Sequence, residues 1–229
     1  MGMTAAAGTP PAFAAQLEIL VFDLDGTLID SSQDLAASVN AALRALGRPV
    51  LSPGQIASFV GDGVPALVRR AMAATGGASD GEIAEATALM LGHYQQHALD
   101  TTCLYPGVAH LLPALAARYE LAVLTNKPEA PARRILAGLG AAAHLGGIYG
   151  GDSFAAKKPD PAGLRAILGT RFPSAAALMI GDSVVDIQTG RGAGAWTCAV
   201  SYGFAPRDWR PGMADWEIGA FGELAALLA

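Results

Sequence analysis

The sequence predicts an α/β protein in which a parallel sheet carries helices on both faces and an all-α segment is inserted as a cap. Three observations lead to this fold class. A short apolar run at residues 17–22 is typical of a buried parallel strand. Residues 31–103 show helical patterns and no convincing strand. From residue 108 onward, strand-like and helix-like segments alternate, which predicts βα units on one parallel sheet.

The first expected elements are a strand and a helix. The segment LEILVFDLDG begins at Leu17, and its apolar residues give way to acids and a glycine, so we place the end of the strand near Asp23. Ser31 then stands three residues before Asp34 in a capping-box pattern, which predicts the start of a helix. Apolar residues continue at helical spacing as far as Gly47, where we expect this helix to end.

The following stretch has the pattern of helices alone, with the clearest ones at residues 66–74 and 82–98. Because the first strand belongs to the same sheet as the later strands, the helical stretch between them is an insertion. We therefore expect three parts: a loose N-terminal tail at residues 1–17, an α/β core formed by residues 18–30 and 104–229, and a helical cap at residues 31–103.

After Tyr105-Pro106-Gly107, short apolar runs alternate with amphipathic segments. The alternation predicts strands at residues 121–124, 147–149, 177–180 and 197–200, and helices at residues 108–117, 128–139, 161–168 and 184–191.

Composition and charge exclude several classes of protein. The 229 residues are 52% hydrophobic and 15% charged, which suffices for a full core and is too apolar for a disordered chain. The net charge of −5 gives no electrostatic footprint for nucleic acid or an anionic membrane, so we expect neither partner. No transmembrane span or signal peptide is expected. Cys103 and Cys198 stand among apolar neighbours and are predicted to be reduced core thiols, which favours a cytoplasmic protein.

Acidic residues gather where strands of the predicted sheet end. Asp23 and Asp25 follow the first strand, with Gly26 for a sharp turn, and Asp182 and Asp186 follow the strand at residues 177–180. Ligands of open α/β sheets bind outside the carboxyl ends of the strands. Acids crowded into one pocket repel each other unless a cation or a proton offsets their charge. Taken alone, Asp182 or Asp186 would more often be a helix cap, because Asp favours that position, and only the combination of acids favours a site.

The chain has only three lysines, and all lie beside predicted strand ends. Lys127 follows Thr125 and Asn126, and Lys157 and Lys158 precede a Pro-Asp-Pro segment. A lysine and hydroxyl donors near a helix N-terminus are suited to phosphate oxygens, whereas acids gather a divalent cation. We expect Lys157 to be a surface lysine beside the functional Lys158.

Four motifs occur in the order DLDGT, LTNK, KKPDP and GDSVVD. This order resembles the haloacid dehalogenase superfamily of phosphotransferases, and the resemblance covers the chain from about Ile19 to the C-terminal helix. It implies a Rossmann-like core, and the inserted helices match the cap of that family. It also implies that a phosphoryl group passes first to an aspartate and then to water.

The resemblance implies a role for the residues of each motif. Asp23 matches the nucleophile that becomes an aspartyl phosphate, and Asp25 matches the general acid for the leaving alcohol and then the base for water. Thr125 and Lys158 match the phosphate clamp, with Asn126 nearby.

The resemblance also implies Mg²⁺ in an oxygen-ligand site. Asp182 matches the direct carboxylate ligand, beside a side-chain oxygen of Asp23 and the main-chain carbonyl of Asp25. Asp186 matches a more distant or alternative ligand.

Within the superfamily, the chain resembles the phosphoglycolate phosphatases most, in segments such as FVGDGVPALVRRAM and GGDSFAAKKPDP. Asp25 argues against a dehalogenase, and the lack of lysine between residues 31 and 105 excludes the Schiff base of phosphonatases. We therefore expect a Mg²⁺-dependent phosphatase that acts on a small phosphorylated metabolite, with 2-phosphoglycolate, cleaved to glycolate and phosphate, as the first choice.

The expected cap contains further candidates. Gly61 and Gly63 precede a helix and could present main-chain N–H groups to a small carboxylate, although an ordinary turn between helices is the alternative. We expect the segment 61–64 and Arg69 to help set substrate choice. His93 and His97 are expected to be surface histidines rather than zinc ligands, because no third ligand is evident.

Three alternatives stay open. One is a broader sugar-phosphate or nucleotide phosphatase, and another is a β-phosphoglucomutase-like phosphotransferase. The third, a catalytically inactive binding module, would lack the nucleophile or a metal acid, whereas Asp23 and Asp182 are both present. A monomer and a homodimer are equally compatible with the sequence. Asp152 is equally a turn former or a residue that orients the site.

Overall fold

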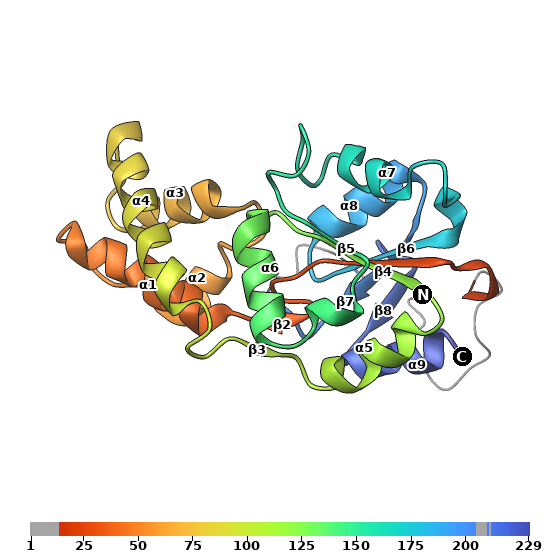
Figure 1. Ribbon diagram of the computed structural model, residues 1–229. Helices are drawn as coiled ribbons and strands as arrows, with labels where there is room; N and C mark the ends of the chain where they lie inside the picture. The colour runs from red at the N-terminus through yellow and green to blue at the C-terminus, as the bar shows by residue number, and fades with distance from the viewer. Residues whose placement is uncertain (1–13, 205–209, 211) are drawn as a thin grey trace.

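The core of the protein is a six-stranded sheet with the order β5-β4-β1-β6-β7-β8, seen in a computed structural model that describes residues 14–204, 210 and 212–229 (Figure 1). At its centre, β1 (Ile19–Phe22) pairs with β4 (Glu120–Leu124) and with β6 (Ala177–Gly181). The outer strands are β5 (Gly147–Tyr149), β7 (Trp196–Val200) and β8 (Trp216–Ile218). Every pairing within this sheet is parallel, which confirms the predicted fold class. The sequence does not predict β8.

Helices cover both faces of the sheet, so all four residues of β1 are buried. Leu20 and Phe22 enter one apolar cluster, while Ile19 and Val21 enter another, as the two-residue period of a strand requires. Figure 1 shows α7 (Ala162–Leu168) and α8 (Val184–Ala193) on one side of the sheet. The other side carries α5 (Val108–Ala116) and the short α9 (Leu224–Leu227), and α6 (Glu129–Gly138) packs into the same cluster as α5.

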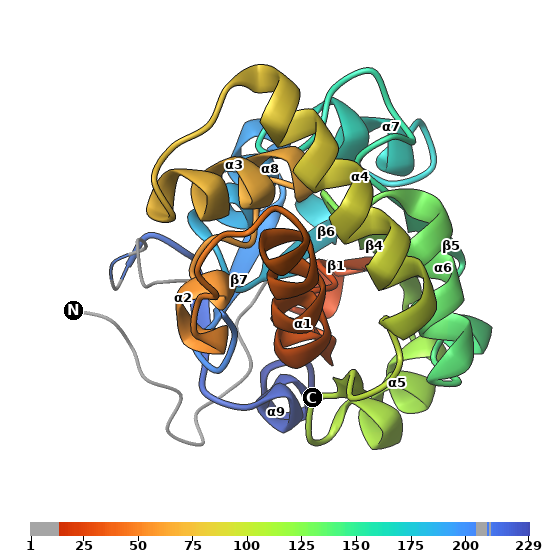
Figure 2. The same ribbon diagram turned by 90° about the vertical axis from the view of Figure 1, so that its left-hand side faces the viewer.

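Four helices stand together beyond the carboxyl end of β1 (Figures 1 and 2). Among them, α1 packs against both α2 and α4, and α3 packs against α4. A capping box between Ser79 and Glu82 fixes the start of α4. The four helices are α1 (Ser32–Ala45), α2 (Pro53–Ala57), α3 (Val64–Ala74) and α4 (Asp80–His97).

The chain enters and leaves this helical group through two strands that pair with each other. They are β2 (Ile29–Asp30) and β3 (Cys103–Leu104), which form a short antiparallel ladder. Beside the ladder, the buried Asp34 carboxylate accepts hydrogen bonds from the main-chain N–H and hydroxyl groups of both Thr101 and Thr102. Burial alone would raise the pKa of Asp34, but these hydrogen bonds lower it below the ordinary value. The two crossings are therefore tied side by side.

The capping box predicted between Ser31 and Asp34 is wrong. The Ser31 side chain makes no cap hydrogen bond and donates instead to the Asp25 carboxylate, while Asp34 is occupied by the two threonines. Both side chains are taken by partners outside the helix. The helix itself exists and ends two residues before the predicted Gly47.

Residues 1–13, most of the expected loose tail, lie outside the described residues. The rest of that stretch contains a short 3-10 helix at Ala14–Gln16, and Leu17 is buried in the core. Both cysteines are free. Cys198 is buried as predicted, whereas Cys103 is exposed in β3, so the prediction of a core thiol is wrong for Cys103. Within the described ranges, no helix is long and apolar enough to cross a membrane.

Candidate active site

Three adjacent strands deliver predicted functional residues to one edge of the sheet. Asp23 follows β1, Thr125 follows β4 and Asp182 follows β6, while Lys158 comes from the loop after β5. Because parallel strands end at the same edge, these four residues of distant sequence position meet in one place. All four are buried.

The turn after Asp25 requires a glycine. Gly26 has a φ of 83°, in the left-handed region, and its N–H donates to the carbonyl of Ile29. A Cβ at this position would overlap the carboxylate of Asp182. The glycine thus lets the β1 turn approach the end of β6 closely enough to bring acids from both strands into one site.

A buried ammonium group lies between two carboxylates. The Nζ of Lys158 is 2.9 Å from Oδ1 of Asp23 and donates to Oδ1 of Asp186 at 2.6 Å. Burial alone would lower the pKa of Lys158, but the charges of Asp186 and Asp23 raise it above its ordinary value. Burial raises the pKa of Asp23 to about 6, against the opposing charge of Lys158. Lys158 is therefore a permanent cation beside the predicted nucleophile.

Asp186 accepts hydrogen bonds from both Ser183 and Lys158. Its Oδ2 accepts from the main-chain N–H and the hydroxyl of Ser183, which closes a capping box at the start of α8, and its Oδ1 accepts from Lys158. The helix-cap alternative for Asp186 is thus present in the structure. The same contacts fix the position of the Lys158 ammonium group.

Three buried carboxylates are close enough to share a cation. Asp23, Asp182 and Asp186 each offer an oxygen, and these oxygens all lie within 4.8 Å of one another. An all-oxygen, anionic donor set fits a hard cation such as Mg²⁺. Asp182 is oriented by the N–H of Phe204, which donates to its Oδ2 at 2.7 Å. The carboxylate of Asp25 is outside this group, in keeping with a predicted contribution through its main-chain carbonyl.

Asp25 instead forms a second ion pair, which the sequence does not predict. Nζ of Lys127 donates to its two oxygens at 2.8 and 3.0 Å, and Ser31 donates to one of them. The ammonium group lies 4.8 Å from the ring centroid of Tyr94 in α4. Burial alone would lower the pKa of Lys127, but Asp25 and Tyr94 raise it. The scarcity of lysine marks Lys127 in the sequence, yet nothing local to it identifies Asp25 as its partner.

Asn126 links the core to the loop before α3. Its Nδ2 donates to the carbonyls of Gly61, at 2.9 Å, and Lys158, at 3.0 Å. The amide predicted to lie near the phosphate is thus used to join two main-chain segments. Its neighbour Thr125 is buried and accepts from the N–H of Lys127 at 3.2 Å.

A pocket lies between this edge of the sheet and the helical group. The core contributes Asp23, Asp25 and the segment Thr125–Lys127, and the opposite wall consists of Leu35, Val60, Gly61, Gly63, Val64 and Leu67. The structure therefore brings Gly61 and Gly63 to the same pocket as the predicted nucleophile.

The loop of Gly61 and Gly63 is held from both sides. Gly63 has a φ of 88°, and a Cβ there would stand 3.1 Å from the carbonyl oxygen of Asn126. Lys157 donates to the carbonyl of Asp62 at 2.6 Å, and Arg70 pairs with the Asp62 carboxylate. Lys157 is exposed, as predicted, but it also anchors this loop to the core.

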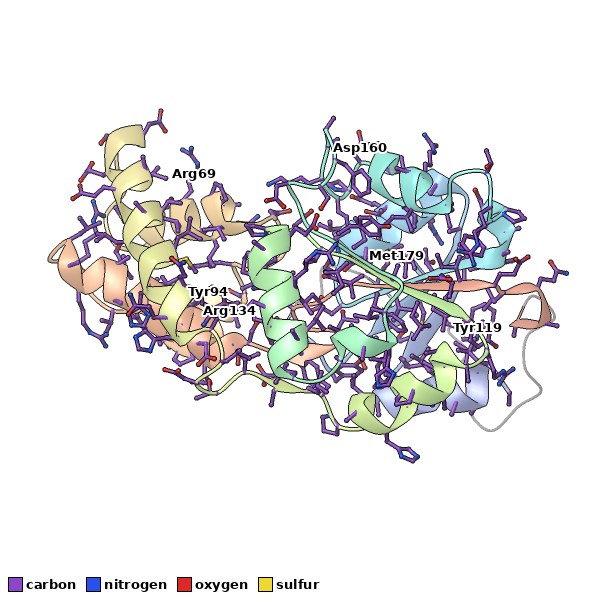
Figure 3. All side chains as sticks on the ribbon, in the orientation of Figure 1. Arg69, Tyr94, Tyr119, Arg134, Asp160 and Met179 are labelled. Atoms are coloured by element: carbon purple, nitrogen blue, oxygen red, sulfur yellow. The ribbon has the colours of Figure 1, made fainter. Side chains whose placement is uncertain are left out.

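Other candidates lie apart from the pocket. Arg69, labelled in Figure 3, pairs with Asp80 and its side chain is 63% exposed, so the structure does not bring it to the site. His93 and His97 stack on each other and contact Ser38 and Asp100. Asp152 accepts from the N–H of Glu129 at the start of α6, which orients the helix that follows β4.

Fold and site together define an α/β enzyme with a cation-compatible acidic site at the carboxyl edge of its sheet. The family model described as haloacid dehalogenase-like hydrolase matches residues 20–200. The chain belongs to the haloacid dehalogenase-like hydrolases, as the four motifs indicate.

The relatives agree with this assignment. A phosphoglycolate phosphatase of Rhodospirillum rubrum is 43% identical over 193 residues, which cover 81% of this chain and 80% of that protein. The plasmid-encoded phosphoglycolate phosphatase of Cupriavidus necator is 39% identical over 81% of each chain. The crystal structure of a predicted phosphoglycolate phosphatase from Haemophilus somnus superimposes with a TM-score of 0.88 at 29% identity, covering 93% of this chain and 99% of that one. The chain is a phosphatase of this family.

Proposed function

We propose that the protein hydrolyses 2-phosphoglycolate to glycolate and phosphate, with Mg²⁺ as the metal and Asp23 as the nucleophile. The observation that carries the proposal is the position of the Asp23 carboxylate, which is buried beside Lys158 and in one pocket with Thr125. The named relatives support the choice of substrate.

In the first step, a carboxylate oxygen of Asp23 attacks phosphorus and the bond from phosphorus to the ester oxygen breaks. Asp25 acts in its protonated form and gives this proton to that oxygen, so glycolate leaves with a complete hydroxyl group. In the second step, water attacks the phosphorus of the aspartyl phosphate, Asp25 takes a proton from the water, and the Asp23 carboxylate is restored. Two displacements thus return both aspartates to their starting forms.

Lys158 and Thr125 would hold the phosphoryl oxygens during both steps, and Asp186 keeps Lys158 in place. Asp23 and Asp182 would hold the cation, with Asp186 as a more distant ligand. When bound, Mg²⁺ supplies positive charge that reduces repulsion between the Asp23 carboxylate and the phosphoryl group. In this proposal, Asp186 acts mainly through Lys158, because both of its oxygens already accept hydrogen bonds.

We further propose that residues 31–103 act as a cap on a core of residues 18–30 and 104–229. The paired strands β2 and β3 form the junction between the two parts. Main-chain N–H groups at Gly61 and Gly63 would face the small carboxylate of the substrate from the cap side of the pocket. The cytoplasm as location, and a monomer or homodimer as the assembly, stay predictions.

The test is a phosphatase panel in the presence of Mg²⁺, with 2-phosphoglycolate, glucose phosphates, nucleotides and pyrophosphate as substrates. We expect the largest kcat/KM for 2-phosphoglycolate and loss of all activity in Asp23→Asn. Full activity in that variant would contradict the mechanism. A flat substrate profile would leave the mechanism in place and contradict the choice of substrate.

A further inference from the structure

The site has two buried lysines, and only one of them is explained by phosphoryl transfer. Lys158 lies against Asp23, where the phosphoryl group would be bound. Lys127 lies against Asp25, on the side where the leaving group would be bound. Its side chain is only 5% exposed, so its charge is held away from bulk water. A buried cation at this place calls for an anionic partner throughout the reaction, because leaving it unpaired is costly.

The surroundings of Lys127 provide one anionic partner and little else that is polar. Lys127 is the single cation among the described residues that line the pocket. The wall that faces it from the cap consists of apolar side chains and the main chain of two glycines. Tyr94 on α4 contributes a ring face beside the ammonium group, and Figure 3 shows Tyr94 on the side of α4 that faces α6.

Asp25 cannot keep both hydrogen bonds to Lys127 and also contact the ester oxygen of the leaving group. In the structure both of its oxygens are turned to Lys127, and one also accepts from Ser31. To reach the ester oxygen of a substrate, the Asp25 carboxyl group has to loosen this pair. A substrate that carries a second anionic group can take over the ammonium group at that moment. A substrate with a neutral leaving group leaves Lys127 without a replacement.

We propose that Lys127 selects phosphomonoesters whose leaving group carries a carboxylate, by exchanging Asp25 for that carboxylate when the substrate binds. This inference rests on the proposed function, and it names the residue by which that site chooses its substrate class. Nζ of Lys127 lies within 3.0 Å of both Asp25 oxygens, and Asp25 would contact the ester oxygen. The carboxylate of the substrate must therefore lie close to its ester oxygen. Neutral alkyl phosphates and sugar phosphates of the same size are disfavoured.

The experiment compares 2-phosphoglycolate with 2-hydroxyethyl phosphate, in which a neutral alcohol replaces the carboxylate. In the unaltered enzyme we expect kcat/KM to favour 2-phosphoglycolate by about 10- to 100-fold, as for a lost hydrogen bond to a charged group. In Lys127→Met the ratio should fall to within a few-fold of one. Arg69→Met removes the same charge from the exposed face of α3 and should keep the ratio of the unaltered enzyme.

A binding measurement separates this inference from the proposed function. Titration calorimetry of Asp23→Asn with both phosphates reports affinity without turnover, and the double variant Asp23→Asn/Lys127→Met should lose the preference. Equal preference in the two proteins would overturn the role of Lys127, as would an unaltered enzyme that does not distinguish the two phosphates. If the unaltered enzyme hydrolyses neither phosphate while Asp23→Asn still binds 2-phosphoglycolate with the Lys127-dependent preference, the proposed function fails and the role of Lys127 in recognition stands.

Lys127→Arg covers the case in which Lys127→Met does not fold. It keeps the charge on a different side chain and should retain the preference for the carboxylate, with a changed KM. An equal loss of activity on both phosphates in Lys127→Arg would show a role in positioning Asp25 alone and would overturn the inference.

Discussion

The two buried lysines of the site lie in regions that are built differently. Lys158 contacts Asp23, which follows β1, and Asp186, which lies in α8, so the core alone provides its charged neighbours. Lys127 contacts Asp25 of the core, but the ring beside it comes from Tyr94 in the helical group. Neighbouring carboxylates raise the pKa of both lysines, so both remain charged at neutral pH.

Because of this difference, we assign phosphoryl transfer to the Lys158 side of the site and substrate choice to the Lys127 side. The residues on the Lys158 side are held in place by the core alone. This side would bind the phosphoryl group, which all substrates share. The Lys127 side is completed by a part of the chain attached through two short paired strands. We infer that changes on the Lys158 side affect every substrate equally, whereas changes on the Lys127 side and its covering loop affect substrates differently.

The largest expected effect is that of Lys158→Met. It removes the phosphate clamp and leaves Asp23 and Asp186 as buried carboxylates without their cation. We expect kcat/KM to fall by about 1,000-fold or more on 2-phosphoglycolate and on a generic aryl phosphate alike. Steady-state kinetics on both substrates checks this, with circular dichroism as the control for folding. A loss confined to one substrate would contradict the division between the two sides.

The attachment of the cap depends on Asp34, and Asp34→Asn tests it. Asp34 accepts hydrogen bonds from four donor groups, the main-chain N–H and the hydroxyl of both Thr101 and Thr102. The substitution replaces this acceptor with an amide that turns an NH₂ toward some of them. We expect the free energy of unfolding at neutral pH to fall by about 2–4 kcal/mol, measured by urea denaturation.

The pH dependence of this effect has a definite sign. Because hydrogen bonds lower the pKa of Asp34 in the folded protein, its stabilising effect is present above the ordinary value of 3.8 and is lost as the pH falls through the lowered folded value. The difference between the two proteins should therefore shrink in acid. A difference that stays constant into acid would contradict the account.

A smaller effect is expected for Gly63→Val. The φ of 88° is strained for valine, and its Cβ would press on the carbonyl of Asn126, so the loop should move away from the pocket. We expect the ratio of activity on 2-phosphoglycolate to that on an aryl phosphate to fall about 10-fold. Gly76→Val, which has a positive φ at the other end of α3 and no neighbour within 4 Å, is the matched control. An unchanged ratio in Gly63→Val would rule out a role for this loop in substrate choice.

The smallest effect is expected for Lys157→Met. This substitution removes one exposed hydrogen bond between the core and the carbonyl of Asp62. Exposed charge contacts contribute little, so we expect KM for 2-phosphoglycolate to rise about 2- to 5-fold with a smaller change in kcat. Steady-state kinetics of Lys157→Met and Lys158→Met on 2-phosphoglycolate, measured side by side, compares the two lysines directly. A loss as large as that of Lys158→Met would mean that the roles of the adjacent lysines are wrongly divided.

The central sheet could be predicted because its strands carry their own signal. Strands β1, β4 and β6 are apolar runs with polar residues directly after them, and the parallel order then brings their ends together. The positions of Asp23, Lys158 and Asp182 at one site follow from this arrangement and from the four motifs. Strand β8 has three residues and no comparable apolar run, and it forms only because β7 offers an edge.

The contacts between the helical group and the core could not be predicted in the same way. Ser31 and Asp34 carry a local capping pattern, yet Ser31 donates to Asp25 in the preceding turn, and Asp34 binds threonines that are distant in the sequence. The pairing of Lys127 with Asp25 lies within the core and is not predicted either, because it depends on how closely the ends of β1 and β4 approach. Sequence patterns report local preference and burial, and they do not report which buried charges meet.

The central claim is that the phosphoryl group passes through Asp23, and detection of the phosphorylated enzyme tests it most directly. The protein is mixed with radiolabelled 2-phosphoglycolate and Mg²⁺, quenched in acid within milliseconds, and digested for mass spectrometry. The account predicts label on the peptide that contains Asp23, formed and lost at rates compatible with turnover, and no label in Asp23→Asn. Turnover without labelled protein in a time course that resolves the first cycle, or label on another residue, would contradict it.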